Sequence, residues 1–253
     1  MEYKIQAACL CNTGLKRKNN EDNFYFGGKT LEENNQGLRA PVSIEASLSG
    51  GMCMAIFDGM GGENYGESAS FAAAREMQNS QGSFSGSFVS EKKYLERMTA
   101  QINAAVVAAA REKSTSHMGS TMVSLHFTPQ MVYACNLGDS RAYRLRGGEL
   151  AQMSKDHVSD RPMPAGKKPP LTQHLGIDPE EMLIEPYIIK AELRPGDQYL
   201  ICSDGLTDMV TNAEIAEILL CSESAEASVG RLIQSALAHG GKDNVTAIVC
   251  RIS

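Results

Sequence analysis

The sequence predicts an α+β fold in which helices pack in layers on antiparallel sheets. Two observations support this prediction. Two long segments with apolar residues at helical spacing follow one another in the first half of the chain, and short apolar strands separated by turn residues occupy much of the second half. A doubly wound parallel sheet would require single strands and helices that alternate, so the order of the segments favours the layered α+β class.

The first half is expected to begin with strands and to continue with two helices. Apolar runs predict strands at 3–7, 24–26 and 52–57. Apolar residues spaced three and four apart predict helices at about 65–79 and 90–112. The segment 81–87 between them reads Gln-Gly-Ser-Phe-Ser-Gly-Ser and has the composition of a flexible loop. Residues 27–51 are expected to form an insertion whose order the sequence leaves open.

Closely spaced strands are expected from residue 121 onward. They cover 122–127, 131–137, 141–145 and 150–153 and are separated by short turn signals such as Arg146-Gly147-Gly148. We interpret them as one antiparallel meander. A loop rich in Pro, Lys and Gly follows at 159–170.

The last third of the chain is expected to contain a strand, two helices and a closing strand. The first strand covers 198–202. Thr211 and Glu214 have the spacing of a capping box and predict the start of a helix. The last helix carries apolar residues between Val229 and Leu237, ends at Gly240-Gly241 and is followed by a strand at 245–252.

Composition excludes several classes of protein. The formal charge of −6 argues against nucleic-acid binding, which needs a basic face. No signal-peptide core or membrane-length apolar run is present, so a cytoplasmic protein without a membrane partner is expected. Cys9 and Cys11 are interpreted as buried strand residues, because a cytosolic thiol stays reduced and no CxxC pair exists. One domain covering residues 1–253 is expected. A chain of this length needs no structural metal, so any bound metal would be catalytic.

Acidic residues recur beside glycine or asparagine at the predicted strand ends. The clusters are Asn20-Glu21-Asp22-Asn23, Asp58-Gly59-Met60-Gly61-Gly62, Gly138-Asp139-Ser140, Ser203-Asp204-Gly205 and Lys242-Asp243-Asn244. A strand holds a carboxylate rigidly at its end, and a following glycine lets a backbone carbonyl or a substrate approach closely. Mg²⁺ and Mn²⁺ select carboxylate, carbonyl and water oxygens, which several convergent aspartates would provide.

A single Asp-Gly pair is as well explained by an ordinary turn. A hairpin turn, however, expects an apolar strand on both sides. Asp58 and Asp204 each follow an apolar strand, and Asp58 is followed by small or polar residues and a predicted helix. The combination therefore favours a metal site over a set of turns.

At these residues the sequence resembles the type 2C metal-dependent protein phosphatases, and most of all their compact bacterial members. The resemblance covers nearly the whole chain. Its motifs are Arg17-x-x-Asn20-Glu21-Asp22-Asn23, Phe57-Asp58-Gly59-Met60-Gly61-Gly62, Gly119-Ser120-Thr121, Asn136-Leu137-Gly138-Asp139-Ser140-Arg141, Lys155-Asp156-His157, Leu171-Thr172-x-x-Leu175-Gly176, Cys202-Ser203-Asp204-Gly205-Leu206-Thr207-Asp208 and Lys242-Asp243-Asn244-Val245-Thr246. The resemblance implies an α-β-β-α sandwich of two antiparallel sheets flanked by helices, with the metal site at one edge.

The resemblance also implies hydrolysis of phosphoserine and phosphothreonine in proteins by a metal-activated water at two Mn²⁺ or Mg²⁺ ions. Asp58 would be shared by both ions, Asp204 and Asp243 would complete one of them, and Glu21 and the Gly59 carbonyl would serve the other. Asp22 would hold metal-bound water and Arg17 would bind the phosphate. Alternatively, Arg17 is one basic residue of the solvated run Lys16-Arg17-Lys18. Asp139 either binds a weaker third ion, with Asp204 as a shared ligand, or orders the turn before Arg141.

Two departures from the family pattern stand out. Many relatives carry a histidine, a proposed general acid, where this sequence has Met60 or Glu63. We therefore assign the protonation of the serine leaving group to Glu63 or to a metal-bound water. The flap after Lys155-Asp156-His157 is short and basic, with Arg161, Lys167 and Lys168. Its lysines either attract acidic phosphopeptides or belong to a solvated loop.

Phosphorylated substrates of a Ser/Thr kinase are the expected partners, with a role in signalling, and a monomer is expected. Two other readings remain open at this point. One is a catalytically inactive, phosphatase-like binding module, although inactive relatives of enzymes usually lose metal ligands and these positions are intact. The other is a phosphatase of small phosphometabolites, which would need a closed pocket in place of an open, shallow cleft.

Overall fold

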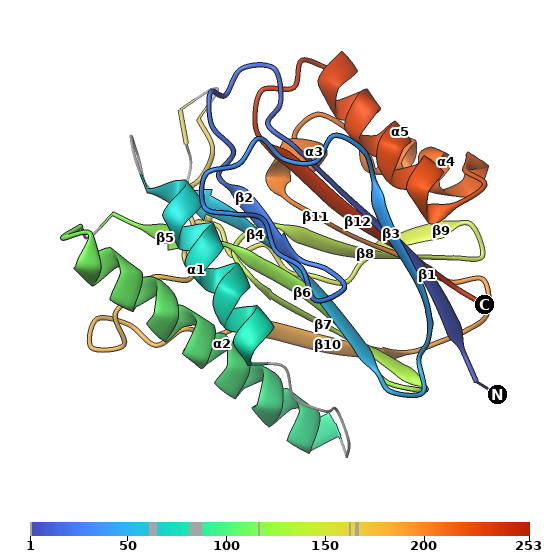
Figure 1. Cartoon of the computed structure of the whole chain (residues 1–253), viewed down its shortest axis with the longest axis horizontal. Helices are drawn as coiled ribbons and strands as arrows, with labels where there is room; N and C mark the ends of the chain where they lie inside the picture. The colour runs from blue at the N-terminus through green and yellow to red at the C-terminus, as the bar shows by residue number, and fades with distance from the viewer. Residues whose placement is uncertain (1, 61–64, 81–87, 116, 162, 165–166) are drawn as a thin grey trace.

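Two antiparallel sheets face one another in the computed structural model, which describes residues 2–60, 65–80, 88–115, 117–161, 163–164 and 167–253 (Figure 1). The first sheet has the order β3 (Val42–Ser47), β1 (Lys4–Asn12), β12 (Val245–Ile252), β11 (Gln198–Cys202), β8 (Arg141–Arg146), β9 (Glu149–Gln152). The second has the order β10 (Tyr187–Glu192), β7 (Met131–Leu137), β6 (Met122–Phe127), β4 (Met52–Met60), β2 (Asp22–Tyr25), and β5 (Gly119–Ser120) pairs with the end of β4. The neighbouring strands of both sheets run antiparallel.

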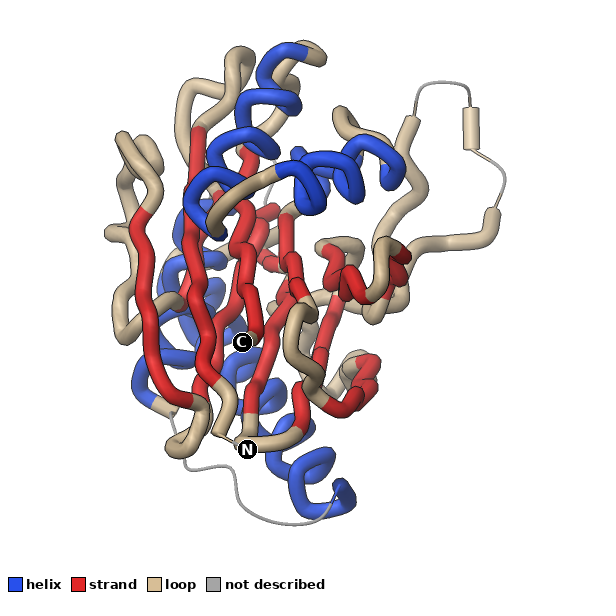
Figure 2. The backbone as a smooth tube through the Cα atoms, turned by 90° about the vertical axis from the view of Figure 1, so that its right-hand side faces the viewer, coloured by secondary structure: helices blue, strands red, loops and turns tan. Residues whose placement is uncertain are grey.

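Helices cover the outer face of each sheet (Figures 1 and 2). Helices α1 (Gly66–Asn79) and α2 (Phe88–Glu112) pack on the second sheet, and α4 (Asn212–Cys221) and α5 (Ala225–Ala238) pack on the first. The short helix α3 (Asp204–Thr207) follows β11 at the edge of the first sheet. The predicted sandwich with helices on both sides is confirmed, and the fold belongs to the α+β class.

Three layers of apolar side chains hold these elements together. The inner faces of both sheets meet in one core, where Ile5 and Cys250 of the first sheet share a cluster with Met54 and Leu125 of the second. Separate clusters join each sheet to its own pair of helices. The middle strands β6 and β11 are buried along their whole length, because both of their faces are covered. This rigid stack leaves the strand ends free to carry polar groups.

Most of the predicted elements are confirmed. Strands β6, β7, β11 and β12 have the predicted bounds, and both long helices begin and end within two residues of the predicted positions. Helix α4 starts at the predicted capping box: the Thr211 side chain accepts from the Glu214 backbone, and the Glu214 side chain accepts from the Thr211 backbone. The loop predicted at 81–87 lies outside the described residues.

The prediction of one meander through residues 122–153 is wrong. Strands β6 and β7 form a hairpin in the second sheet, while β8 and β9 form a hairpin in the first. The chain crosses between the sheets at Gly138, whose φ of 103° lies in a region that favours glycine. Strand alternation predicts a buried face but does not identify the sheet to which the strand belongs.

Residues 27–51 are ordered and end in β3, which pairs with β1 at the edge of the first sheet. Strand β10 was also missed by the sequence pattern; it pairs with β7 at the edge of the second sheet. Cys9 and Cys11 lie buried on β1, and all the cysteines are free thiols, as predicted. No helix in the described part of the chain is both long and apolar enough to span a lipid bilayer.

Candidate metal centre

A cleft of about 450 Å³ lies at the edge where strands of both sheets end. Its lining includes all the acidic residues predicted to touch a cation, except Asp22, which lies buried beside it. The lining residues are Arg17, Glu21, Asp58, Gly59, Met60, Thr121, Asp139, Lys168, Pro169, Pro170, Leu171, Asp204 and Asp243. Residues from the beginning, middle and end of the chain therefore meet at one place.

Pairing of β2 with β4 brings the N-terminal acidic residues to Asp58. Asp22 is opposite Asp58 in the register of the two strands. The Gly59 amide donates to the Glu21 carbonyl at 3.0 Å. The Asp58 backbone is held on its other side by Thr121, whose amide donates to the Asp58 carbonyl at 2.8 Å. Glu21 and Asp58 are thus fixed side by side through their backbones.

Asn244 ties the C-terminal acidic motif to the N-terminal one. Its Oδ1 accepts from the Glu21 amide at 2.8 Å, and its Nδ2 donates to the carbonyls of Thr13 and Asn19 at 2.9 and 3.0 Å. A Cβ on Gly205 would lie 1.9 Å from the Asn244 carbonyl oxygen, so only glycine permits α3 to approach this segment so closely. Asp204 and Asp243 are brought to the same cleft by this contact.

Asp22 is buried beneath the cleft, with 1% of its surface exposed. Its Oδ2 accepts from the Ser203 hydroxyl at 2.8 Å and from the Thr246 hydroxyl at 2.6 Å, whereas its Oδ1 is buried without a partner in the described residues. Burial raises the pKa of Asp22 to about 7, although the two hydroxyls act against this shift. An orphaned, oriented carboxylate oxygen beside other carboxylates fits a bound cation or its water.

Burial and mutual repulsion raise the pKa values of the carboxyl groups around the cleft. The pKa of Asp58 is raised well above its ordinary value by burial, then by the charge of Asp204 and of three further aspartates. Burial and Asp204 raise the pKa of Asp139 to about 6. Burial also raises the pKa of Glu21, despite the attraction of Arg17. Convergent carboxyl groups with raised pKa values indicate a functional site, and bound cations would offset the repulsion between them.

Two basic side chains lie among these carboxylates. Arg17 Nη2 is 2.7 Å from Asp243 Oδ2, and Arg17 Nη1 is 3.6 Å from Glu21 Oε2. The Lys168 ammonium pairs with two other carboxylates, those of Asp204 and Asp208. Within the described residues, no group of three or more His, Cys, Asp or Glu side chains is already arranged as a cation cage. The donor set is nevertheless all oxygen, as Mg²⁺ and Mn²⁺ require.

The residues present therefore fit a pair of such ions. Glu21, Asp58, Asp139, Asp204 and Asp243 line the cleft, and Asp22 lies buried opposite Asp58 in the pairing of β2 with β4. Glu63, predicted as a general acid, lies outside the described residues. The sequence did not predict the contact of Lys168 with the aspartates or the hydroxyls that orient Asp22. Ser203 and Thr246 belong to the motifs at 202–208 and 242–246. Their membership of these motifs is the sequence signal that could have identified the two hydroxyls.

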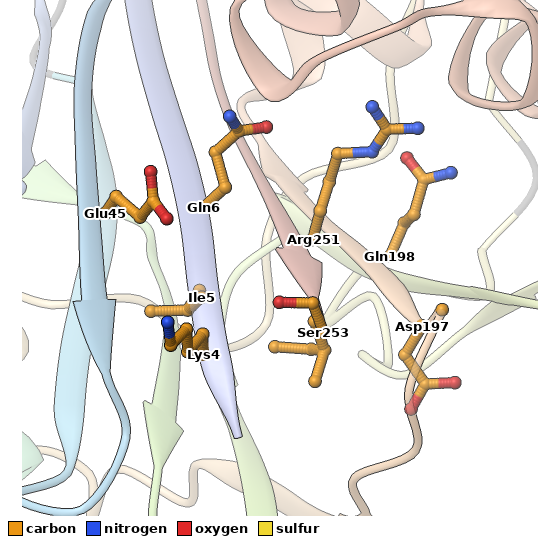
Figure 3. Close-up of a pocket in the computed structure, with 10 residues that line it drawn as sticks. Lys4, Ile5, Gln6, Glu45, Asp197, Gln198, Arg251 and Ser253 are labelled. Carbon is orange, nitrogen blue, oxygen red and sulfur yellow. The ribbon is translucent and has the colours of Figure 1, made fainter. Parts of the chain in front are cut away.

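A second hollow, of about 360 Å³, lies on the first sheet near both ends of the chain (Figure 3). It contains Lys4, Glu45, Asp197 and Arg251. The Asp197 carboxylate is already engaged by Arg146, with both guanidinium contacts at 2.6 Å. This hollow offers no convergent set of free carboxylates and differs in kind from the acidic cleft.

Comparison with known proteins identifies the family. A family model described as protein phosphatase 2C matches residues 43–238, which is more than half of the chain. Serine/threonine protein phosphatase PstP of Mycobacterium tuberculosis is 33% identical over 259 residues, which cover 98% of this chain and 45% of that protein. The chain thus spans about half the length of this relative. Serine/threonine phosphatase stp of Listeria monocytogenes is 28% identical over 97% of this chain and 95% of its own length.

Solved structures give the same result. PppA, described as a key regulatory component of T6SS in Pseudomonas aeruginosa, matches with a TM-score of 0.79 at 27% identity, over 98% of each chain. The catalytic domain of PstP in complex with two manganese ions matches with a TM-score of 0.75 at 30% identity, over 99% of each chain. The residues matched by the family model include Asp58, Asp139 and Asp204 of the acidic cleft, whereas Arg17, Glu21 and Asp243 lie outside them. The chain belongs to the protein phosphatase 2C family.

Proposed function

We propose that this chain hydrolyses phosphoserine and phosphothreonine in proteins and depends on two Mn²⁺ or Mg²⁺ ions. The observation that carries the proposal is the convergence of Glu21, Asp58, Asp204 and Asp243 on one cleft. The names of the PstP and stp relatives and the two manganese ions of the PstP structure support it. When bound, such ions supply an activated water for in-line attack on phosphorus and offset charge on the phosphoryl oxygens.

The chain's own residues hold the ions and the substrate. Asp58 is the shared ligand, Asp204 and Asp243 serve one ion, and Glu21 and the Gly59 carbonyl serve the other. Asp22 would hold a water beside the ions, because Ser203 and Thr246 occupy its Oδ2 and its Oδ1 has no partner among the described residues. These assignments are the ones that the resemblance to the phosphatase family implies, and the convergence of the side chains on one cleft supports them.

Arg17 binds the phosphate in this proposal. Its side chain is 44% exposed at the rim of the cleft, so it can exchange Asp243 for an incoming phosphate oxygen. A planar guanidinium suits bidentate contact with phosphate better than an ammonium does. The contact would strengthen as charge develops on the phosphoryl group.

An exposed rim favours protein substrates over small phosphometabolites. Arg17 and Lys168, which both line the cleft, expose about half of their side chains (44% and 52%). A site for a small metabolite would enclose its ligand. We infer that the chain acts as one catalytic unit on phosphoproteins produced by a Ser/Thr kinase, as a monomer in the cytoplasm.

Removal of metal or of one ligand tests the proposal. Hydrolysis of a phosphothreonine peptide should require Mn²⁺ and stop with EDTA, and Asp204→Asn should lower kcat/KM by at least about 100-fold. Asp160→Asn is the matched control, because it removes the same charge from an exposed position of the neighbouring loop. Equal activity of Asp204→Asn and Asp160→Asn would reject the metal mechanism. Mn²⁺ binding without hydrolysis of any phosphopeptide would favour the inactive binding module.

Glu63 is proposed as the acid that protonates the leaving serine or threonine oxygen. Glu63→Gln should slow hydrolysis of a phosphoserine peptide by about 100-fold, the usual size of general acid catalysis, and should slow hydrolysis of p-nitrophenyl phosphate much less. The reason is that nitrophenolate leaves without a proton. An equal loss on both substrates would show that Glu63 is not the acid, and a metal-bound water would then take that role.

A further inference from the structure

The loop of residues 159–170 brings a lysine into the acidic cleft. Its described parts project from the body of strands in Figure 2. Hydrogen bonds close its base: the Ser159 amide donates to the Pro170 carbonyl at 3.0 Å, and the Thr172 amide donates to the His157 carbonyl at 2.8 Å. Pro169 joins Lys168 to Pro170 at this base, and the two successive prolines restrict the backbone. The backbone at Lys168 is therefore held rigidly close to the cleft.

The Lys168 ammonium contacts carboxylates other than those that Arg17 contacts. It pairs with Oδ2 of Asp204 and Oδ2 of Asp208. Its charge also reaches Asp139, whose pKa it lowers against the larger effects of burial and Asp204. The neighbouring Lys167 is exposed and forms no ion pair with any residue that the structure describes. Of the two neighbouring lysines in this loop, Lys168 therefore contacts the acidic residues of the cleft.

We propose that Lys168 is a tethered cation that takes the side of the centre formed by Asp139, Asp204 and Asp208 and keeps a third divalent ion from it. This inference rests on the proposed two-ion centre. An ammonium carries three donors and can satisfy two carboxylates at once. A divalent ion that binds on the same side would have to displace the Lys168 ammonium, and the carboxylates of Asp204 and Asp208 would have to reorient. On this proposal Asp139 binds no third ion, and the Lys168 ammonium offsets part of its charge.

Metal stoichiometry tests the inference without reference to activity. Mn²⁺ bound per chain is measured by equilibrium dialysis up to about 5 mM, which covers the range of weak oxygen-ligand sites. Wild type and Lys167→Met should saturate at about two ions per chain, and Lys168→Met should bind about one ion more. Lys168→Arg keeps the positive charge and should bind as wild type does. Lys168→Gln repeats the test with a polar replacement should the methionine variant fold poorly.

The outcomes separate this inference from the proposed function. The same saturation for wild type, Lys168→Met and Lys168→Gln would reject the role of Lys168 and leave the two-ion centre intact. Three ions bound by wild type would also reject it. No binding of Mn²⁺ by any variant would reject the two-ion centre itself. An additional ion in Lys167→Met as well would show that loop charge, rather than the Lys168 contact, controls the number of ions.

Discussion

Replacing Asp58 by asparagine is expected to abolish Mn²⁺-dependent hydrolysis and to make the protein more stable in the presence of EDTA. Asp58 stands at the end of β4 in the middle of the acidic cleft, where the proposal gives it to both ions. Loss of a shared ligand should lower kcat/KM by at least about 1,000-fold, because positioning of both ions depends on it. The stabilisation that Mn²⁺ confers on wild type against heat should disappear as well.

The stabilising half of this prediction follows from repulsion. Burial, and then the charges of Asp204, Asp22, Asp243 and Asp139, raise the pKa of Asp58. A carboxyl group whose pKa is raised by folding stabilises the protein below its unfolded value of about 4, and this contribution is lost as pH rises. A neutral asparagine does not ionise, so the variant is not destabilised in this way as pH rises. We expect a gain of about 0.5–2 kcal/mol at neutral pH, which shrinks as pH falls toward about 4.

Thermal unfolding in EDTA measures this effect, and Asp197→Asn is the matched control. Asp197 is also buried, but its pKa is lowered: burial acts to raise it, and hydrogen bonds from Arg146 and the Arg194 amide outweigh burial. Asparagine should therefore destabilise the protein at position 197 by about 2–3 kcal/mol, opposite in sign to position 58. A lower melting temperature for Asp58→Asn in EDTA, or full Mn²⁺-dependent activity, would contradict the role given to Asp58.

Local sequence patterns were sufficient to predict the central elements of this fold. Strands β6, β7, β11 and β12 are apolar along nearly their whole length, and helix α4 begins at its capping box. The bounds of these elements can therefore be predicted from neighbouring residues in the sequence. Edge strands β3 and β10 expose alternate side chains and contain Ser43, Glu45 and Lys190, which weakens their apolar signal. The assignment of hairpins to sheets depends on long-range pairing, as between β8 and β11, which no local pattern encodes.

In the candidate site, too, local motifs predicted some features, while others depend on contacts between distant segments. Motifs predicted which acidic residues line the cleft, because each motif combines a strand end with a carboxylate. The contact of Lys168 with Asp204 and Asp208 depends on where the backbone near Pro169 places this lysine relative to the cleft. Its composition alone was equally consistent with a solvated loop. A charged residue on a loop acquires a function only through the path of the backbone, which lies beyond sequence periodicity.

Replacing Gly59 by alanine should damage both stability and metal binding, because this residue is confined by backbone on two sides. A Cβ at this position would lie 1.9 Å from the Gly66 carbonyl oxygen and 2.7 Å from the Glu21 carbonyl oxygen. Neither neighbour is a flexible side chain. Either the start of α1 or the segment carrying Glu21 must move. Both movements disturb Glu21, because Gly66 at the start of α1 also lies close to the Glu21 carboxyl group.

We expect Gly59→Ala to reduce the free energy of unfolding by about 2–4 kcal/mol, which corresponds to about 5–15 °C in Tm for a chain of this size. Mn²⁺ affinity, measured by calorimetry, should fall by at least about tenfold, because a displacement of the Gly59 carbonyl and Glu21 by a fraction of an ångström alters the geometry that Mn²⁺ or Mg²⁺ requires.

Gly230→Ala separates this effect from the general consequence of adding a methyl group. Gly230 lies inside α5, and a Cβ there meets no atom within 4 Å. Alanine should raise stability at this position by about 0.5–1 kcal/mol, since it lowers the entropy of the unfolded chain and favours the helix. Mn²⁺ affinity should not change. If Gly59→Ala instead behaves like Gly230→Ala, the close approach of Gly66 and Glu21 does not hold the two sides of the cleft together, and the geometry proposed for Glu21 and the Gly59 carbonyl is wrong.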